Sequence, residues 1–306
     1  MSGRRHLHNV PASGNRAAGG TKAVILAGGR GTRLAPYTSI LPKPLMPIGE
    51  RSILETVVDQ LESHGFTDIT FCVGYLSHLI RAVFDARGYE NVRIDYVQEE
   101  MPLGTAAPLK LVDDLDETFL MMNGDVLTTL DYRDLVRHHH AAGNLLTVAT
   151  RKRRIKIDYG VVHVNDEQGS ETVLAWEEKP EIVSTVSMGI YVLEPAALAY
   201  IPTEGHFDVP DLVHTMVDAG ERVGVYRHEG LWFDIGRQED YHQAVATWFE
   251  HGAESETAGD AVTTASADSG AAARAASAHA SSSAGTSLAS VAHGRARRAT
   301  RGKLVR

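Results

Sequence analysis

Glycines and arginines cluster in a short segment that follows an apolar run near the start of the chain. The segment contains Gly28, Gly29, Arg30, Gly31 and Arg33. Glycine lets backbone N–H groups come close to a ligand, and such amides between a strand and a helix form a cradle for an anion. The two guanidinium groups add charge that suits phosphate, the alternative being a tight turn with solvated arginines. We therefore predict a phosphate-binding loop.

Two familiar phosphate-binding motifs do not fit this loop. A P-loop requires Gly-Lys followed by Ser or Thr, and no such triplet follows. The dinucleotide fingerprint requires a third glycine, and Leu34 stands at that position. A nicotinamide-dependent oxidoreductase is therefore disfavoured.

A lysine and two aspartates add further groups suited to a phosphorylated ligand. Lys43 lies between Pro42 and Pro44, which keep the backbone stiff and position the cation. Asp125 and Asp234 each follow a short apolar stretch, at the end of a predicted strand where α/β sheets bind ligands. Carboxylates in such places suit Mg²⁺, although each aspartate alone equally suits a turn or a helix cap.

The elements that must position these residues alternate along the chain. Apolar runs predict strands at 22–27, 68–73, 92–97, 118–122 and 145–150. Helical spacing predicts helices at 53–61, 77–86, 105–112 and 131–140. Strands separated by helices form a largely parallel sheet with helices on both faces.

The second half of the chain is less regular. Short strands are expected at 160–164, 172–176, 187–193, 223–226 and 231–233. Helices are expected at 209–219 and 237–250. We predict an α/β fold: a Rossmann-like three-layer αβα sandwich with a mostly parallel mixed sheet and a small antiparallel substrate lobe.

Three successive histidines, at positions 138–140, have the look of a metal cluster. Successive helix positions point about 100° apart, so three such rings do not face one ion. A solvated helix end is expected instead.

Composition divides the 306 residues into three parts. Residues 251–306 contain 17 Ala and 9 Ser and no aromatic residue, which predicts a disordered tail with a basic end. Residues 1–20 are expected to form a disordered arm, and residues 21–250 the folded domain.

Charge and composition exclude several classes of function. The net charge is −9, and residues 21–250 alone carry −15, which makes a poor nucleic-acid surface. The single cysteine, Cys72, excludes an internal disulfide and fits a reducing compartment. No apolar run approaches the roughly 20 residues that span a bilayer, and no apolar signal segment is visible. A cytoplasmic protein without membrane or nucleic-acid partners is expected.

An ordered series of motifs covers residues from about 22 to 245. The series is Gly28–Leu34, Pro42–Leu45, Pro102–Ala106, Asn123–Val126, Tyr159–Val161, Glu178–Pro180, Met188–Val192 and Trp232–Gly236. It resembles the sugar-1-phosphate nucleotidyltransferases, and its guanylyltransferase-like members in particular. The resemblance implies an enzyme in which a sugar-1-phosphate oxygen attacks the α-phosphorus of a nucleoside triphosphate, pyrophosphate leaves, and Mg²⁺ is the cofactor.

The resemblance also implies roles for individual residues. The catalytic group would be Arg33, Lys43, Asp125 and Lys179, and the metal ligands Asp125 and Asp234. The nucleotide would contact Leu26, Ala27, Gly28, Gly29, Gly31, Thr32, Arg33, Lys43, Gln98, Pro102, Gly104 and Thr105. The acceptor would contact Gly124, Tyr159, Gly160, Glu178, Lys179, Met188 and Gly189.

The nucleotide and the acceptor are less well defined than the reaction. The similarity of Pro102–Ala106 to guanylyltransferases favours GTP, with Gln98 reading the base edge. Met188 and Val126 replace polar residues of many relatives, so the acceptor pocket is expected to suit a deoxy-sugar, heptose or cyclitol phosphate, with mannose-1-phosphate also compatible. The alternative is a non-catalytic, nucleotide-sugar-binding regulatory relative. The oligomeric state stays open, a homo-oligomer included.

Overall fold

The computed structural model describes residues 21–165 and 172–248, which belong to one compact unit that ends at Glu250. The predictions for residues 1–20 and 251–306 lie outside the described residues. Within the described part of the chain, no helix is both long and apolar enough to cross a membrane.

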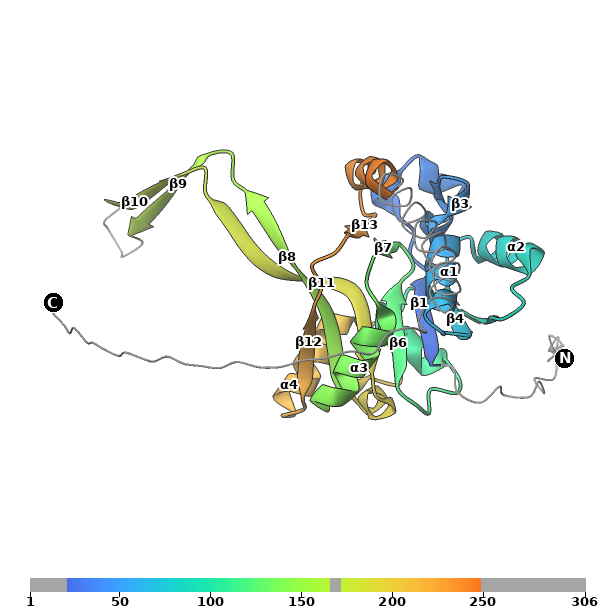
Figure 1. The fold of residues 1–306 in the computed structure, drawn as a ribbon. Coiled ribbons are helices and arrows are strands. Elements are labelled where there is room, and N and C mark those ends of the chain that lie inside the picture. The colour runs from blue at the N-terminus through green and yellow to red at the C-terminus, as the bar shows by residue number, and fades with distance from the viewer. Residues whose placement is uncertain (1–20, 166–171, 249–306) are drawn as a thin grey trace, which may run out of the picture. The chain divides into compact units, whose positions relative to one another are not determined.

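A seven-stranded sheet, in the order β12-β8-β11-β6-β1-β4-β5, forms the centre of the fold (Figure 1). Its strands are β1 (Lys22–Ala27), β4 (Asp68–Val73), β5 (Arg93–Gln98), β6 (Phe119–Asn123), β8 (Leu146–Lys156), β11 (Glu181–Leu193) and β12 (Val223–Arg227). Only β11 runs antiparallel to its neighbours, β6 and β8. The mostly parallel mixed sheet is therefore confirmed.

The carboxyl ends of the parallel strands meet at one edge of this sheet. Leu26 of β1 pairs with Asn123 of β6, and Ala27 pairs with Val73 of β4. The backbone N–H of Gly124 donates to the carbonyl of Leu26 at 2.9 Å. The glycine loop after β1 and the turn after β6 consequently lie side by side.

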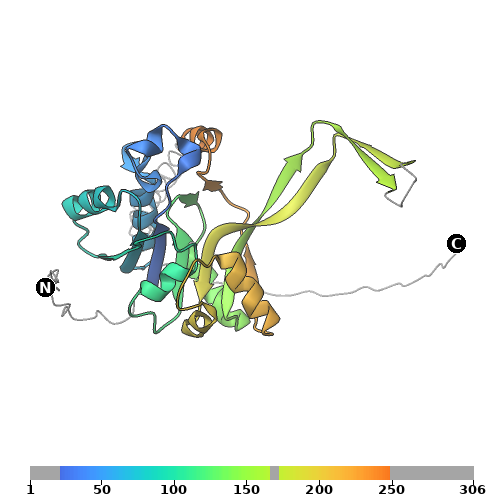
Figure 2. The ribbon, with the colours of Figure 1, turned by 180° about the vertical axis from the view of Figure 1, so that it is seen from behind.

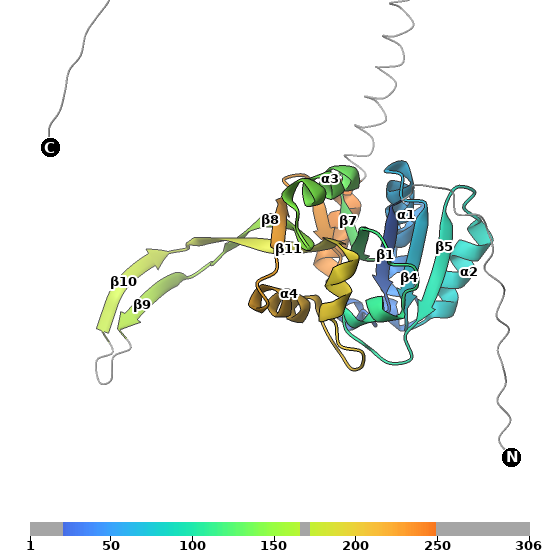
Figure 3. The same ribbon diagram turned by 90° about the horizontal axis from the view of Figure 1, so that it is seen from below.

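Helices cover both faces of the sheet, because alternate side chains of each strand point to opposite faces. On one face α1 (Ile53–Ser63), α2 (Ser77–Arg87) and α3 (Tyr132–Ala142) pack in one core with Ile25 and Met122. On the other face α4 (Val209–Asp218) and the 3-10 helices η4 (Ala107–Leu111) and η5 (Pro195–Tyr200) pack with Val24 and Met121. The three layers are visible in Figure 3.

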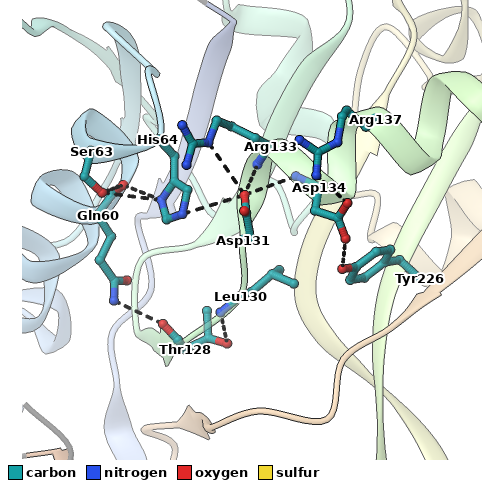
Figure 4. A network of polar contacts seen from close by, with 10 residues as sticks. All are labelled: Gln60, Ser63, His64, Thr128, Leu130, Asp131, Arg133, Asp134, Arg137 and Tyr226. Atoms are coloured by element: carbon teal, nitrogen blue, oxygen red, sulfur yellow. Dashed lines mark hydrogen bonds and ion pairs between the residues drawn. The ribbon is translucent and has the colours of Figure 1, made fainter. Parts of the chain in front are cut away.

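Capping side chains fix where the helices begin. Ser52 and Glu55 form a reciprocal capping box at the start of α1. At the start of α3, the Asp131 carboxylate accepts the N–H groups of Arg133 and Asp134, at 2.9 and 3.1 Å. Figure 4 shows how this cap joins a larger network, in which Asp131 also faces His64, the residue that follows α1, and Asp134 accepts the hydroxyl of Tyr226 from β12. The network ties two helices to the edge strand of the sheet.

The middle histidine of α3 contradicts the prediction of a solvated helix end. His138 and His140 are exposed as expected, but the His139 side chain is fully buried. Its Nδ1 lies 2.8 Å from the hydroxyl of Thr147, and its Nε2 lies 3.1 Å from Glu194 Oε1. His139 is thus a polar core residue that links α3 to β8 and to the end of β11.

The antiparallel lobe consists of strands that continue past the central sheet. β8 pairs with β12 only as far as Thr150, and β11 pairs with β6 only from Ile190 onward. Between these points β8 and β11 pair with each other alone, and β9 (Gly160–Asn165) pairs with β10 (Thr172–Glu178). We call residues 151–165 and 172–187 the arm, which leaves the sheet in Figures 1 and 2.

Some local elements differ from those predicted. The segment expected to be a helix at 105–112 is the shorter 3-10 helix η4, whose second residue is Pro108. Strand β13 (Trp232–Asp234) pairs antiparallel with β7 (Val126–Thr128), a strand that the sequence did not indicate. The chain also forms the short pair β2 (Pro47–Ile48) and β3 (Arg51–Ser52), and positions 238–248 are helical.

Candidate functional site

A cleft of about 400 Å³ opens at the carboxyl edge of β1 and β6. The predicted nucleotide and metal residues that line it are Leu26, Ala27, Gly28, Gly29, Gly31, Thr32, Arg33, Lys43, Pro102, Gly104, Thr105 and Asp125. Four lining residues were not predicted, namely Pro44, Glu99, Asn123 and His206. We call this space the nucleotide cleft. Residues from five separate stretches of sequence meet in it.

The glycine loop is shaped by two close approaches. A Cβ on Gly28 would lie 2.5 Å from Glu99 Oε1, so a side chain there would displace the glutamate from the cleft. Gly31 has a φ of 60°, which favours glycine, and its carbonyl accepts the Thr38 hydroxyl at 2.8 Å. The 3-10 turn η1 (Thr32–Leu34) follows and carries Arg33. The local sequence therefore keeps the loop open to a ligand.

Lys43 holds the two aspartates together. It is buried in the 3-10 helix η3 (Lys43–Leu45), and its ammonium makes a short ion pair with Asp125. Its Nζ also lies 3.9 Å from Asp234 Oδ1. The prolines on either side fix the backbone, so the cation stays between the carboxylates.

The strand pair β7–β13 brings Asp125 and Asp234 to the same place. Asp234 pairs with Val126 across these strands, and the N–H of Ile235 donates to the carbonyl of Asp125 at 3.2 Å. Backbone hydrogen bonds thus hold two carboxylates that are far apart in the sequence.

The electrostatics of this pair are those of a cation site. Burial raises the pKa of Asp234 above its usual range, and the charge of Asp125 adds to that rise while Lys43 and Arg33 oppose it. Asp125 Oδ1 is buried without a hydrogen-bond partner among the described residues. A free buried oxygen beside a half-exposed second carboxylate fits a hard divalent cation, so the residues present suit Mg²⁺.

Arg33 lies close to the segment that carries Asp234. A Cβ on Gly236 would lie 3.7 Å from an Arg33 guanidinium nitrogen. Nearby, the amide of Gln238 donates to the carbonyl of Ala35 at 2.9 Å. The helical positions 238–248 are thereby anchored to the loop that presents Arg33.

The far wall of the cleft is built around Thr105 and Glu99. The N–H and hydroxyl of Thr105 both donate to Asp208 Oδ1, at 2.8 and 2.9 Å. Glu99 is partly buried, accepts the N–H of Leu103 at 3.3 Å, and has a pKa raised by burial. Gln98, the residue predicted to read the base, is exposed and does not line the cleft, and its amide donates to the carbonyl of Glu99 at 3.2 Å.

Three of the predicted acceptor residues lie beside the nucleotide cleft. Gly124 is buried next to Ile25. Gly189 has a φ of 72° in the irregular part of β11, where a Cβ would lie 2.6 Å from the Asn123 amide. Met188 is buried, and its carbonyl accepts the indole N–H of Trp232 at 3.0 Å. Gly124 and Gly189 are packed against neighbouring residues of the site. The Met188 side chain lies in the core, so it does not contact the acceptor in this arrangement.

The other predicted acceptor residues lie on the arm. The described residues that line the nucleotide cleft do not include Tyr159, Gly160, Glu178 or Lys179. Gly160 packs against the ring of Trp176, whose indole donates to Glu178 at 3.2 Å. Lys179 is exposed, with a φ of 49°. The structure therefore groups these four residues with one another and apart from Asp125.

Comparison with known proteins agrees with this geometry. The family model described as nucleotidyl transferase matches residues 22–250. The UTP–glucose-1-phosphate uridylyltransferase of Synechocystis sp. is 34% identical over 244 residues, which cover 73% of this chain and 62% of that protein. The mannose-1-phosphate guanyltransferase of Aspergillus fumigatus is 34% identical over 229 residues, which cover 72% of this chain and 62% of that protein. The matched region thus spans less than two thirds of the length of these relatives.

Solved structures share the fold. HddC from Yersinia pseudotuberculosis superposes with a TM-score of 0.58 at 23% identity, covering 74% of this chain and 99% of that one. A glucose-1-phosphate thymidylyltransferase from Bacillus anthracis, described as putative in its own structure, gives a TM-score of 0.59 at 23% identity, covering 74% and 94%.

Proposed function

The chain belongs to the sugar-1-phosphate nucleotidyltransferase family, and on that premise we propose that it transfers a nucleotidyl group from a nucleoside triphosphate to a sugar- or cyclitol-1-phosphate. The oxygen of the acceptor phosphate attacks the α-phosphorus, the bond to the β-phosphate oxygen breaks, and pyrophosphate leaves. The product is a nucleoside-diphosphate sugar or cyclitol.

The cluster of Lys43, Asp125 and Asp234 beside the glycine loop carries this proposal. Transfer between two anionic phosphates depends on positioning and charge neutralisation more than on proton transfer. The glycine loop and Arg33 line the cleft in which the triphosphate is proposed to bind, and Lys43 adds a buried positive charge to the same lining. A magnesium ion held by Asp125 and Asp234 would neutralise phosphate charge and align the reacting groups.

GTP is the nucleotide that we propose. One of the relatives described above is a guanyltransferase, while the other is a uridylyltransferase. Glu99 lies in the nucleotide cleft, and a carboxylate has the capacity to accept two N–H groups, as the N1–H and N2–H edge of guanine requires. Gly104 lines the same cleft without a side chain, which lets a base ring approach its backbone.

Glu178 and Lys179 are proposed to contact the acceptor and its phosphate, with Tyr159 and Gly160 beside the sugar ring. All four lie on the arm. Their role therefore requires the arm to bend toward the nucleotide cleft when the acceptor is present.

A matrix of four nucleoside triphosphates against sugar and cyclitol 1-phosphates, read by pyrophosphate release, tests the proposal. We expect release in the presence of Mg²⁺ with at least one pair, and the highest kcat/KM with GTP. Binding of nucleotide without release from any pair would instead identify a regulatory relative. A higher kcat/KM for UTP would keep the reaction and overturn the choice of nucleotide.

A further inference from the structure

Asp234 also lines a second cleft, of about 520 Å³, in which Asp125 is not a lining residue. Its walls come from the base of the arm, from β13 and from the helical positions 238–248. The lining residues are Arg151, Lys152, Arg153, Arg154, Leu231, Trp232, Phe233, Asp234, Asp240, Gln243 and Thr247. We call this space the basic cleft. Since Lys43 reaches both Asp125 and Asp234, the two clefts meet at the carboxylate pair.

Positive charge dominates the basic cleft. Four consecutive cations, at positions 151–154, stand against the two carboxylates of Asp234 and Asp240. Within the described residues only Arg154 among these cations has an acidic partner, Glu181, at 3.7 Å. The charge of Arg151 also reaches His228, whose pKa is lowered mainly by burial and further by this arginine. All four residues line the cleft, but their side chains alternate between the two faces of β8, and most of their charge has no acidic partner among the described residues.

The spread of these cations exceeds what one phosphate needs. A strand rises about 3.3 Å per residue, so Arg151 and Arg153, which share one face of β8, are separated by about 7 Å along it, and Lys152 and Arg154 lie on the other face. A single acceptor phosphate beside Asp234 contacts only part of that length. Neutral sugar hydroxyls would leave the remaining guanidinium groups facing a ligand without a matching charge.

We propose that the basic cleft binds a second anionic group of the acceptor, so that the substrate is a sugar or cyclitol that carries a carboxylate or a further phosphate besides its 1-phosphate. This inference rests on the proposed function. The 1-phosphate lies at Asp234, next to the α-phosphorus, and the second anion lies farther along β8 against Arg151 and Arg153. Residues 21–250 carry a net charge of −15, so this local reversal of sign selects a small anion rather than a nucleic acid.

Steady-state kinetics with acceptors built on one ring test the inference. Glucose-1-phosphate, glucuronic acid 1-phosphate and glucose-1,6-bisphosphate differ only in the group at C6, and the corresponding mannose compounds form a second set. We expect the wild-type kcat/KM to be about tenfold or more higher for a member with a second anionic group than for the member with the 1-phosphate alone, the size of effect that a charge-assisted hydrogen bond gives. Comparison of glucuronic acid 1-phosphate with glucose-1,6-bisphosphate shows which second anionic group is preferred.

Variants locate the effect. The double variant Arg151→Ala/Arg153→Ala is expected to lose the preference for the acceptor with two anionic groups. Its kcat/KM for the acceptor with the 1-phosphate alone should change much less. Lys156→Ala removes a cation from the same strand that does not line the basic cleft, and should keep the preference. Calorimetric titration with the bisphosphate should show about tenfold weaker binding to the double variant only.

Two results would overturn the inference. One is an equal kcat/KM of the wild-type protein for acceptors with one anionic group and acceptors with two. The other is a preference that survives in the double variant. In either case pyrophosphate release continues, which separates failure of this inference from failure of the proposed function.

Discussion

Lys43 is the residue on which the geometry of the site depends. It pairs with Asp125 and faces Asp234. The pairing of β7 with β13, two strands far apart in the sequence, brings these aspartates together. Burial, and after it the charge of Asp125, raise the pKa of Asp234, and Lys43 opposes this rise by placing a cation between the carboxylates.

Replacing either aspartate tests whether both act through one ion. Asp125→Asn and Asp234→Asn keep the shape of the side chain and remove its charge. Each should lower kcat by about 10²-fold or more in pyrophosphate-release assays, because charge stabilisation of this size is typical of metal-assisted transfer. The double variant should be little worse than either single one.

Asp218→Asn is the matched control for the aspartate pair, because this exposed residue at the end of α4 lines neither the nucleotide cleft nor the basic cleft. It should keep most of the wild-type kcat. Near-normal turnover of both Asp125→Asn and Asp234→Asn at saturating Mg²⁺ would reduce the two aspartates to turn residues.

Glu99 should decide the choice of base. In Glu99→Gln one acceptor oxygen becomes an N–H₂ donor that faces the guanine N–H groups. The kcat/KM for GTP should fall by about tenfold or more, while that for UTP changes less. Gln98→Glu, at the exposed neighbouring position, serves as the control, and an unchanged ratio of GTP to UTP in Glu99→Gln would exclude Glu99 as the reader of the base.

The sequence predicted most of the residues that meet in the nucleotide cleft, because the glycine loop and the strand ends are local patterns. It did not distinguish Gln98 from Glu99, since neighbouring residues at a strand end face opposite sides and only the packing against Gly28 shows which one enters the cleft. Contacts such as Lys43 with Asp125 depend on pairing between distant segments, which local spacing does not reveal.

At the scale of the elements, His139 couples α3 and β8 to pH. Burial lowers the pKa of His139 below its usual value, although the neighbouring Glu194 carboxylate opposes this. As pH falls below about 6.5 the unfolded chain takes up a proton that the folded chain does not, so the free energy of unfolding decreases. The loss ends once pH passes the lower pKa of the folded state.

Urea unfolding at several pH values checks this coupling. Below pH 6.5, the free energy of unfolding should fall with decreasing pH. The contribution of His139 to this slope should be at most about 1.4 kcal/mol per pH unit. His139→Gln should be less stable at pH 8 and should lose that contribution. His138→Gln, which changes an exposed residue of the same helix, should keep the wild-type slope. An identical slope in His139→Gln would show that other groups govern the pH dependence.

Element boundaries were predictable where burial sets the pattern. Strand β4 and the start of α1 agree with their apolar spacing, because one face of each is fully in the core. The continuation of β8 beyond Thr150 was not predicted. Residues 151–156 are mostly exposed and largely cationic, so they show no alternation of apolar and polar side chains. The predicted helix at 105–112 is instead the 3-10 helix η4, which begins at Ala107, so that Pro108 lies in its first turn, where the missing N–H costs no hydrogen bond.

At the scale of the whole molecule, two cores on opposite faces of one sheet account for the folded part. Both cores are closed by residues between Ala23 and Ala244. A chain that ends after Gly252 should therefore keep the melting temperature and turnover of the full chain, because the removed residues have little apolar surface. A melting temperature lower by several degrees would show that the removed segment contributes to the fold.

The order of strands has a consequence for how the chain can be divided. Strand β11 lies between β6 and β8 although the arm separates it from them along the chain. Fragments 1–158 and 159–306, made by a break between β8 and β9, each contain part of the same interleaved sheet, and the first alone would expose the facing edges of β6 and β8. Co-expressed with a tag on one of them, the two fragments should copurify and release pyrophosphate, whereas each alone should aggregate. The protein would then reassemble from two pieces, with the peptide bond between Asp158 and Tyr159 acting only as a covalent link.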